Sequence, residues 1–149
     1  MPLTNQAKDN LGDHMFLNTA AIHYGDNAGL LAAAAPGSTE LSLAIGAGYA
    51  ATDTTMITNE VAYTGYARPT SPRSGTGYTS VDGAIANAQI ELFGEMTAGG
   101  PQTVTEFGMT FNIITANYLQ WYGALDSSLI INNNVEPQFA VGALDLTIT

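Results

Sequence analysis

The sequence contains no cysteine and is poor in positive charge. Only three of its 149 residues are Lys or Arg, against thirteen Asp or Glu, so the formal net charge is −10. Without a thiol, the chain can form no disulfide and carry out no thiolate chemistry. Binding to nucleic acid needs a basic surface that neutralises phosphates, and an anionic membrane would likewise repel an acidic protein. We therefore expect neither nucleic acid nor a membrane as a partner.

Long apolar runs are also missing. The longest, at residues 28–35, is far short of the ~18 residues that suggest a membrane span. Residues 1–14 lack the apolar core of a signal peptide, so we expect a soluble protein. Charged residues make up only 11% of the chain, well below the average of about 25%. Such a surface suits a protein that is partly covered by partners, although an all-β protein with outer faces rich in Thr, Asn and Ser would have the same composition.

The clearest positive signal is an alternation of apolar and polar residues between residues 102 and 131. A period of two is typical of β-strands with one buried face. Two strands on either side of a polar break at residues 115–117 are predicted to form an aromatic-rich hairpin. The only tryptophan, Trp121, lies in the second strand, so the hairpin is expected to supply the centre of a β core. The residues on the expected core side are Thr105, Phe107, Met109, Phe111, Leu119, Trp121, Gly123 and Leu125.

Shorter alternating segments surround this hairpin. Strands are predicted at residues 39–45, 61–66, 85–93 and 139–149, with an exposed loop at residues 70–77. Turn signals at intervals of roughly 8–12 residues are typical of a sandwich or jelly roll. A parallel α/β architecture is disfavoured because no helix-length periodic segment lies between the strands. The sequence predicts an all-β fold, namely an antiparallel, jelly-roll-like β-sandwich.

Residues 4–16 are expected to form a short N-terminal helix, with Thr4 as its N-cap. Gly12 should weaken this helix by up to ~1 kcal/mol. Because so short a helix is marginal alone, its apolar stripe must pack on the sheet or on a neighbouring subunit. The residues of the stripe recur every four positions and are Ala7, Leu11 and Met15.

Residues 17–38 have little periodicity, and their turn signals predict an arm or a long connection. The length fits one domain, since domains commonly have about 100–200 residues. We therefore expect a single β-sandwich domain over residues 1–149, with its helix in residues 1–16 and its arm in residues 17–38.

The nearest match to a nucleotide motif is GAGYAA at residues 46–51, directly after a predicted strand. A dinucleotide site would need a helix beginning there, to aim backbone N–H groups at a pyrophosphate. Residues 52–55 read TDTT instead, so glycines of a β-turn are the better interpretation. A P-loop is excluded because the only lysine, Lys8, lies in the predicted helix. We predict no cofactor.

Catalytic residues are not indicated either. There is no G-x-S-x-G elbow, and His14 and His23 both lie in the N-terminal region. Glu91 and Glu106 lie on predicted strands and are the best candidates for a glycosidase-like carboxylate pair. Any antiparallel sheet with a polar face carries such acids, however, so we predict no catalytic site and no enzymatic activity.

Oxygen ligands that suit calcium occur at residues 132–134, which are all Asn, and at Glu136. The spacing is not that of an EF-hand. Asparagine tolerates left-handed backbone, so a turn is the better interpretation, and we predict no metal site.

Aromatic residues in a β-protein can form the core, an oligomer interface or a sugar-binding surface. Packing into the core explains those on the same side as Trp121. For Tyr63, Tyr66 and Tyr122 both an interface and the core remain open. The candidate interface residues on the strands and the helix are Leu11, Met15, Tyr63, Tyr66, Tyr118, Gln120 and Tyr122.

The succession of EVAYTGYARP, AIANAQIELF, TVTEFGMTF and YLQWYGALDSSLII resembles a family of small virion proteins of tailed bacteriophages. Some of these proteins are described as tail-fibre or minor structural proteins, and similar ones are head decoration (cement) proteins. At position 106 this chain has Glu before Phe107, where similar proteins often have histidine.

This resemblance implies a compact β-sandwich that associates with itself, commonly as a homotrimer, on the virion. Our leading expectation is a decoration protein on the exterior of the capsid, where residues 1–16 and 17–38 contact the major capsid protein. The alternative is a tail-tip or tail-fibre domain that binds a glycan or protein of the host surface. A polysaccharide depolymerase is a distant third.

Overall fold

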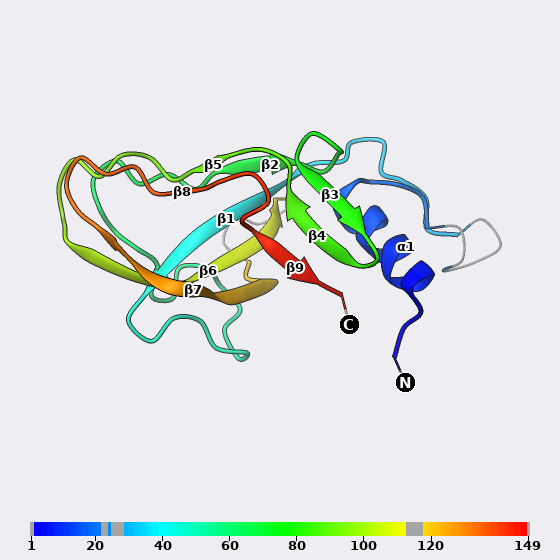
Figure 1. The fold of residues 1–149 in the computed structure, drawn as a ribbon, viewed down its shortest axis with the longest axis horizontal. Helices are drawn as coiled ribbons and strands as arrows, with labels where there is room; N and C mark the ends of the chain where they lie inside the picture. Colours follow the sequence, from blue (N-terminus) through cyan, green and yellow to red (C-terminus); the bar gives the residue numbers. More distant parts are fainter. Residues whose placement is uncertain (1, 22–23, 25–28, 113–117, 149) are drawn as a thin grey trace. The chain divides into compact units, whose positions relative to one another are not determined.

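The computed structural model describes residues 2–21, 24, 29–112 and 118–148. Most regular structure is antiparallel β-sheet, with one short helix near the N-terminus (Figure 1). This confirms the predicted all-β class and is consistent with a sandwich. The chain divides into two compact units, so the single domain stays a prediction. We call residues 1–37, 71–91 and 139–149 the helix unit, and residues 38–70 and 92–138 the hairpin unit.

The hairpin unit is built on β1 (Ser38–Ile45), β6 (Gln102–Asn112) and β7 (Trp121–Ile131). They belong to a sheet of order β2-β1-β6-β7. Only the first residue of β2 (Thr70–Pro72) belongs to this unit, because its segment 38–70 ends at Thr70. The antiparallel β6–β7 pair confirms the predicted hairpin. Its predicted polar break at residues 115–117 lies outside the described residues.

Both faces of the central strands are buried. Residues 41–44 of β1 are buried in succession, which a strand with one solvated face would not show. On one face Leu43 lies opposite Phe107, and both side chains are buried. The other face carries a buried cluster of Ala44, Tyr49, Met56 and Leu119.

Trp121, predicted to lie on the core side of the hairpin, is not among the buried core residues. It is half-buried on β7, the last strand in the sheet order of the described residues, and its ring meets Phe111 edge-on at 5.0 Å. The pairing also shifts along β7, because Ala124 lies opposite Glu106 whereas Leu129 lies opposite Val104. Residues 125–128 therefore form a bulge in this strand.

The predicted strand at residues 61–66 is wrong. This segment makes only isolated bridges, from Glu60 to Ala44 and from Thr64 to Ala98. Gly65 has a φ of +102°, and a Cβ there would lie 2.0 Å from the carbonyl oxygen of Glu95. A left-handed backbone packed so tightly against a neighbouring chain segment interrupts the ladder that the alternation predicts.

In the helix unit, α1 (Asn5–Phe16) packs on the hairpin of β3 (Tyr78–Val81) and β4 (Ala84–Asn87) (Figure 1). β9 (Asp145–Thr147) continues this sheet in the order β3-β4-β9. Thr4 is the N-cap, as predicted, and its hydroxyl accepts a hydrogen bond from the N–H of Ala7 at 3.2 Å.

The buried face of α1 differs from the predicted stripe. Gly12 and Phe16 are its buried residues, whereas Leu11 and Met15 are half-buried. A Cβ on Gly12 would lie 2.7 Å from the hydroxyl of Ser80. The glycine that weakens the helix locally is therefore what lets it approach β3 closely.

Two further predictions of strands and loops need correction. The predicted strand at residues 85–93 is split into β4 and β5 (Glu91–Leu92), and β5 pairs with β8 (Gln138–Phe139), the first part of the predicted closing strand. The predicted exposed loop at residues 70–77 includes β2 and three buried residues, Ser71, Arg73 and Gly77.

Arg73 is buried because its guanidinium serves the C-terminal end of α1. It donates to the carbonyl oxygens of His14 at 2.7 Å, Met15 at 2.5 Å and Pro36 at 2.9 Å. The last carbonyls of a helix have no partner within the helix, and a cation is favourable at that end. One side chain from the predicted loop thus ties together three segments of the helix unit.

Candidate functional site

The most exposed aromatic residues of the described chain are Tyr118 and Tyr122, which lie just before and at the start of β7. Tyr118 is 56% exposed and Tyr122 is 42% exposed. Ile57, in the loop that is bridged to Tyr118 through Thr55, is 59% exposed. We call these three residues, Ile57, Tyr118 and Tyr122, the tyrosine platform.

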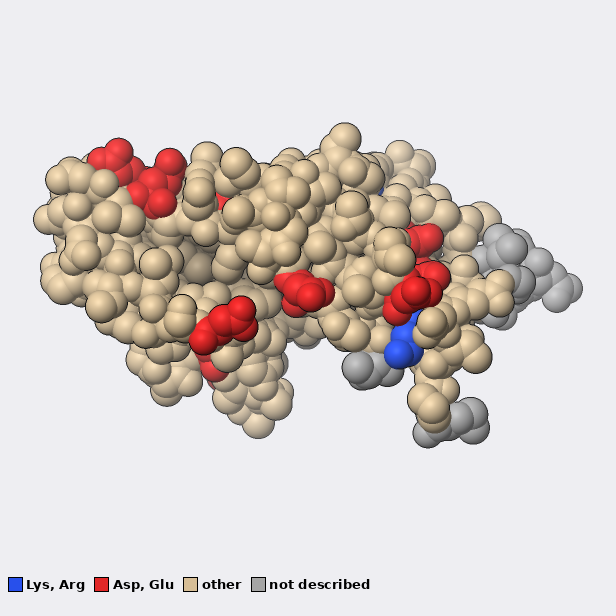
Figure 2. Space-filling model, in the orientation of Figure 1, with Lys and Arg blue, Asp and Glu red and all other residues tan. Residues whose placement is uncertain are grey.

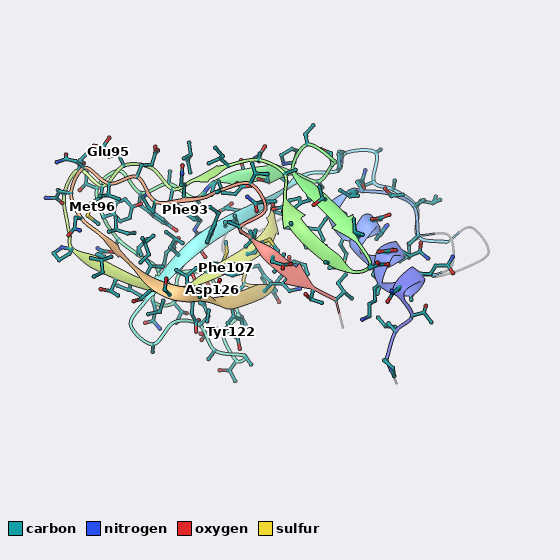
Figure 3. The ribbon with its side chains drawn as sticks, viewed as in Figure 1. Phe93, Glu95, Met96, Phe107, Tyr122 and Asp126 are labelled. Atoms are coloured by element: carbon teal, nitrogen blue, oxygen red, sulfur yellow. The ribbon has the colours of Figure 1, made fainter. Side chains whose placement is uncertain are left out.

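The platform rests on a fixed support. Tyr122 lies on the sheet face opposite to Gly123 and its partner Phe107 (Figure 3), and its ring meets the buried ring of Tyr49 edge-on at 6.4 Å. The hydroxyl of Tyr49 donates to the carbonyl oxygen of Met56 at 2.7 Å and shares a hydrogen bond with Ser42 at 2.8 Å. Burial raises the pKa of Tyr49 to about 12, so its phenol stays neutral.

Glu106 completes this support. Its Oε2 accepts a hydrogen bond from the backbone N–H of Tyr49 at 2.6 Å. Gly48 has a φ of +67°, and a Cβ there would lie 2.3 Å from the carboxyl carbon of Glu106. The glycine and the acid together hold the loop of residues 46–57 against the sheet.

The entrance to β7 is fixed in the same way. The N–H of Leu119 donates to the carbonyl oxygen of Thr54 at 3.2 Å. Gln120, predicted as an interface residue, is exposed but accepts a hydrogen bond from the N–H of Phe111 at 2.8 Å through its Oε1. Its amide therefore serves the hairpin, while the two tyrosine rings beside it face solvent.

Tyr63 and Tyr66, also predicted as interface residues, have partners inside the hairpin unit. The buried hydroxyl of Tyr63 donates to the carbonyl oxygens of Phe93 at 3.1 Å and Gly94 at 3.0 Å. Tyr66 is half-buried, and its hydroxyl donates to Oε1 of Glu60 at 2.8 Å. Of the two alternatives left open by the sequence, these contacts favour the core for both residues.

Glu60 belongs to a group of charges that is largely buried. Arg68 donates to Glu60 at 2.5 Å and to Glu40 at 2.8 Å, and the three side chains are only 13–14% exposed. Hydrogen bonds to Glu60 are the main cause that raises the pKa of Arg68. Burial, with Glu60 next, raises the pKa of Tyr66. This group ties β1 to residues 60–68 and is structural.

The predicted helix residues Leu11 and Met15 lie on α1 in the helix unit, where their exposure is intermediate. Nearby, on another part of α1, an open hollow of about 290 Å³ is lined by polar groups and one tyrosine. The hydroxyl of this tyrosine donates to the carbonyl oxygen of Ala7 at 3.1 Å. The residues that line the hollow are Thr4, Gln6, Ala7, Asn10 and Tyr24.

The residues weighed for catalysis are engaged in other contacts or belong to different units. Glu91 belongs to the helix unit and is 1% exposed, whereas Glu106 belongs to the hairpin unit. Nδ1 of His14 is 2.9 Å from the carbonyl oxygen of Thr19, and His23 lies outside the described residues. Residues 46–51 form a turn with two left-handed glycines rather than the start of a helix, as predicted.

The Asn-rich segment is also a turn, as predicted. Asn134 has a φ of +65° and donates from its N–H to the carbonyl oxygen of Met96 at 2.7 Å. In the described ranges, no three His, Asp or Glu residues lie close enough to hold a metal ion. The face in Figure 2 shows acidic side chains in several separate groups and few basic atoms.

No helix in the described part of the chain combines the length and apolar character that crossing a bilayer requires.

Comparison with known families decides the class of protein. The sequence matches the family described as Podophage GP4 fiber I protein gp80 over residues 2–147. The chain belongs to this family. It is therefore a structural protein of the phage virion, which confirms the resemblance at that level. The name of the fiber I protein family fits the tail-fibre alternative better than capsid decoration. No curated protein matches the sequence.

Sequence reasoning found part of the platform of this fiber I family member and missed the rest. The alternation in β7 placed Tyr118 and Tyr122 on the side away from Trp121 and so identified them. Tyr49 and Ile57 were not singled out, because the loop of residues 46–57 has no periodicity. The available signal was the pair Gly46 and Gly48 before Tyr49, which predicts a tight turn back onto the strand.

Proposed function

We propose that this protein is a non-catalytic component of a podophage tail fibre. The observation that carries this proposal is the match of nearly the whole chain to a family named for a fibre protein. Decoration of the major capsid protein has less support, because neither the family name nor a contact within the described residues favours the head.

A structural role also agrees with how the acids of the chain are used. Glu106 accepts a backbone hydrogen bond, and Glu60 and Glu40 hold Arg68. Catalytic carboxylates need access to substrate, whereas these groups stabilise the fold. The protein is proposed to supply a rigid shape that neighbouring subunits contact.

We further propose that the chain associates as a homotrimer and that the tyrosine platform contributes to a contact. Tyrosine is enriched in interfaces because it combines a large apolar surface with few rotatable bonds and a polar tip. The support beneath Tyr122, formed by Tyr49 and Glu106, fixes the ring before a partner arrives, which lowers the entropy cost of association.

Locating the protein on the particle tests this proposal directly. A tagged chain should be found on the tail by cryo-electron microscopy of intact phage, in a small number of copies per particle. Hundreds of copies spread over the head would contradict a tail fibre and support decoration. Purified chain analysed by light scattering should have the mass of a trimer, and a monomer at all concentrations would contradict self-association.

A tail fibre that contacts the host makes a second measurement informative. Purified protein should compete with phage for adsorption to host cells if it carries the receptor-binding surface, in which case a glycan or a protein of the host surface is its target. Unchanged adsorption at saturating protein would restrict the role to the internal structure of the fibre.

A further inference from the structure

Glu91 is a carboxyl group buried without a charged partner. It is the first residue of β5 and is 1% exposed. Its Oε1 accepts a hydrogen bond from the hydroxyl of Ser71, and the amide of Gln89 donates to the same hydroxyl at 2.7 Å. Its Oε2 is buried and has no hydrogen-bond partner in the described part of the chain.

No cation comes from the strands next to Glu91. β8, which pairs with β5, consists of Gln138 and Phe139. Arg73, the charged residue next to β2, directs its guanidinium to the carbonyls of His14, Met15 and Pro36.

Other charged side chains of the chain have contacts of their own. On β1, which follows β2 in the sheet order, Glu40 is bound to Arg68. On α1, the carboxylate of Asp9 accepts from the N–H of Gly83 at 3.0 Å, and the stem of Lys8 lies against the same glycine.

A carboxylate in this place is unfavourable. Ionised Glu is an acceptor only, and a buried charge with an unbonded oxygen carries a large desolvation cost. Burial accordingly raises the pKa of Glu91, and the nearby polar side chains of Ser71 and Gln89 offset this only in part. A neutral acid avoids the charge and keeps the contact with Ser71.

We propose that Glu91 is a neutral carboxylic acid in the folded protein, so that folding of the helix unit takes up a proton at this side chain. In the unfolded chain Glu91 is ionised above about pH 4.3. The stabilising contribution is therefore complete below that pH and is lost as the pH rises through the higher pKa of the folded state. The contribution of Glu91 to stability is thus larger in acid and falls as the pH rises, opposite to that of a salt-bridged acid.

The test compares the full chain with Glu91→Gln, which has the same shape but cannot ionise. The urea unfolding equilibrium of both proteins is measured from about pH 4 to about pH 9. Relative to the variant, the unfolding constant of the natural chain should rise by about tenfold per pH unit between the unfolded and folded pKa values of Glu91. Glu95→Gln is the matched control, because Glu95 is exposed, and its profile should run parallel to that of the natural chain.

Parallel pH profiles for the natural chain and Glu91→Gln would overturn the proposal. A second measurement covers the case in which Glu91→Gln does not fold. The infrared carbonyl stretch of a protonated carboxylic acid should be present in the folded natural chain at a pH above the usual pKa of Glu, about 4.3, and should vanish when urea unfolds the protein. Absence of this band in the folded protein would also overturn the proposal.

Discussion

Each of the two units encloses an arginine, and the two side chains are satisfied in different ways. In the hairpin unit Arg68 is bound by two carboxylates, Glu60 and Glu40, so that this group carries formal charges of both signs. In the helix unit Arg73 is bound by carbonyl oxygens of His14, Met15 and Pro36.

This contrast indicates what each arginine stabilises. Arg68 compensates buried negative charge, so removing it leaves carboxylates unpaired. Arg73 joins backbone segments and compensates dipoles only, and burial lowers its pKa. Glu91, a buried acid of the helix unit, has no cation beside it and is proposed to be neutral. Loss of charge balance should therefore damage the hairpin unit more than the helix unit.

The largest effect is expected from Arg68→Met. It leaves Glu60 and Glu40 largely buried without their cation, which costs about 3 kcal/mol or more. Urea unfolding should show this loss in the free energy of unfolding. Adding Glu60→Gln and Glu40→Gln should recover part of the stability, since the uncompensated charges are then gone. If the triple variant is no more stable than Arg68→Met, charge is not what Arg68 compensates.

Arg73→Met is expected to cost less, about 2 kcal/mol, because it leaves carbonyl acceptors unsatisfied but no charge unpaired. Its effect should be local. Hydrogen exchange should show faster exchange of amides in α1, with little change in β6 and β7. Uniform loss of protection over both units would contradict the assignment of Arg73 to the end of the helix.

The loop under the tyrosine platform gives a matched pair of glycines. Gly46 and Gly48 have φ values of +65° and +67°, but a Cβ at Gly46 has no neighbour within 4 Å, whereas one at Gly48 would overlap Glu106. Backbone strain alone should make Gly46→Ala cost about 1 kcal/mol. Gly48→Ala should cost more and break the bond from Tyr49 to Glu106. Equal losses in thermal unfolding would show that Glu106 moves aside freely.

The sequence predicts best where local pattern and tertiary packing agree. The β6–β7 hairpin and the N-cap Thr4 follow from alternation and from side-chain hydrogen bonding to the backbone. It fails where tertiary contacts override the pattern. Residues 61–66 alternate like a strand, but Gly65 is packed against the carbonyl of Glu95. Arg73 lies among turn residues, which predict exposure, but the structure buries it. The local sequence could not show this because the partners of Arg73 are far away in the sequence.

The same limit applies to the candidate site. Periodicity identified Tyr118 and Tyr122 but could not separate them from Tyr63 and Tyr66, since all four are tyrosines in or near extended segments. Only the tertiary structure shows that the hydroxyl of Tyr63 is bound to backbone carbonyls while Tyr118 is exposed. Burial of Glu91 was equally invisible, because its alternation predicted a polar face.

The smallest effect on stability is expected at the tyrosine platform. Tyr118→Ala and Tyr122→Ala remove exposed rings, so unfolding should change by no more than about 0.5 kcal/mol for Tyr118, and somewhat more for Tyr122, which contacts Tyr49. Association should respond far more strongly, with a smaller mass in light scattering and fewer copies on the particle, because interface aromatics dominate binding energy.

The matched control for this pair lies in the other unit. Val81→Ser removes an apolar side chain that is 67% exposed, at the end of β3 in the helix unit. If association depends on the tyrosine platform, Val81→Ser should assemble normally although it too removes an exposed apolar side chain. Equal loss of assembly in the two variants would mean that exposed apolar area in general, rather than the supported rings of the hairpin unit, drives association.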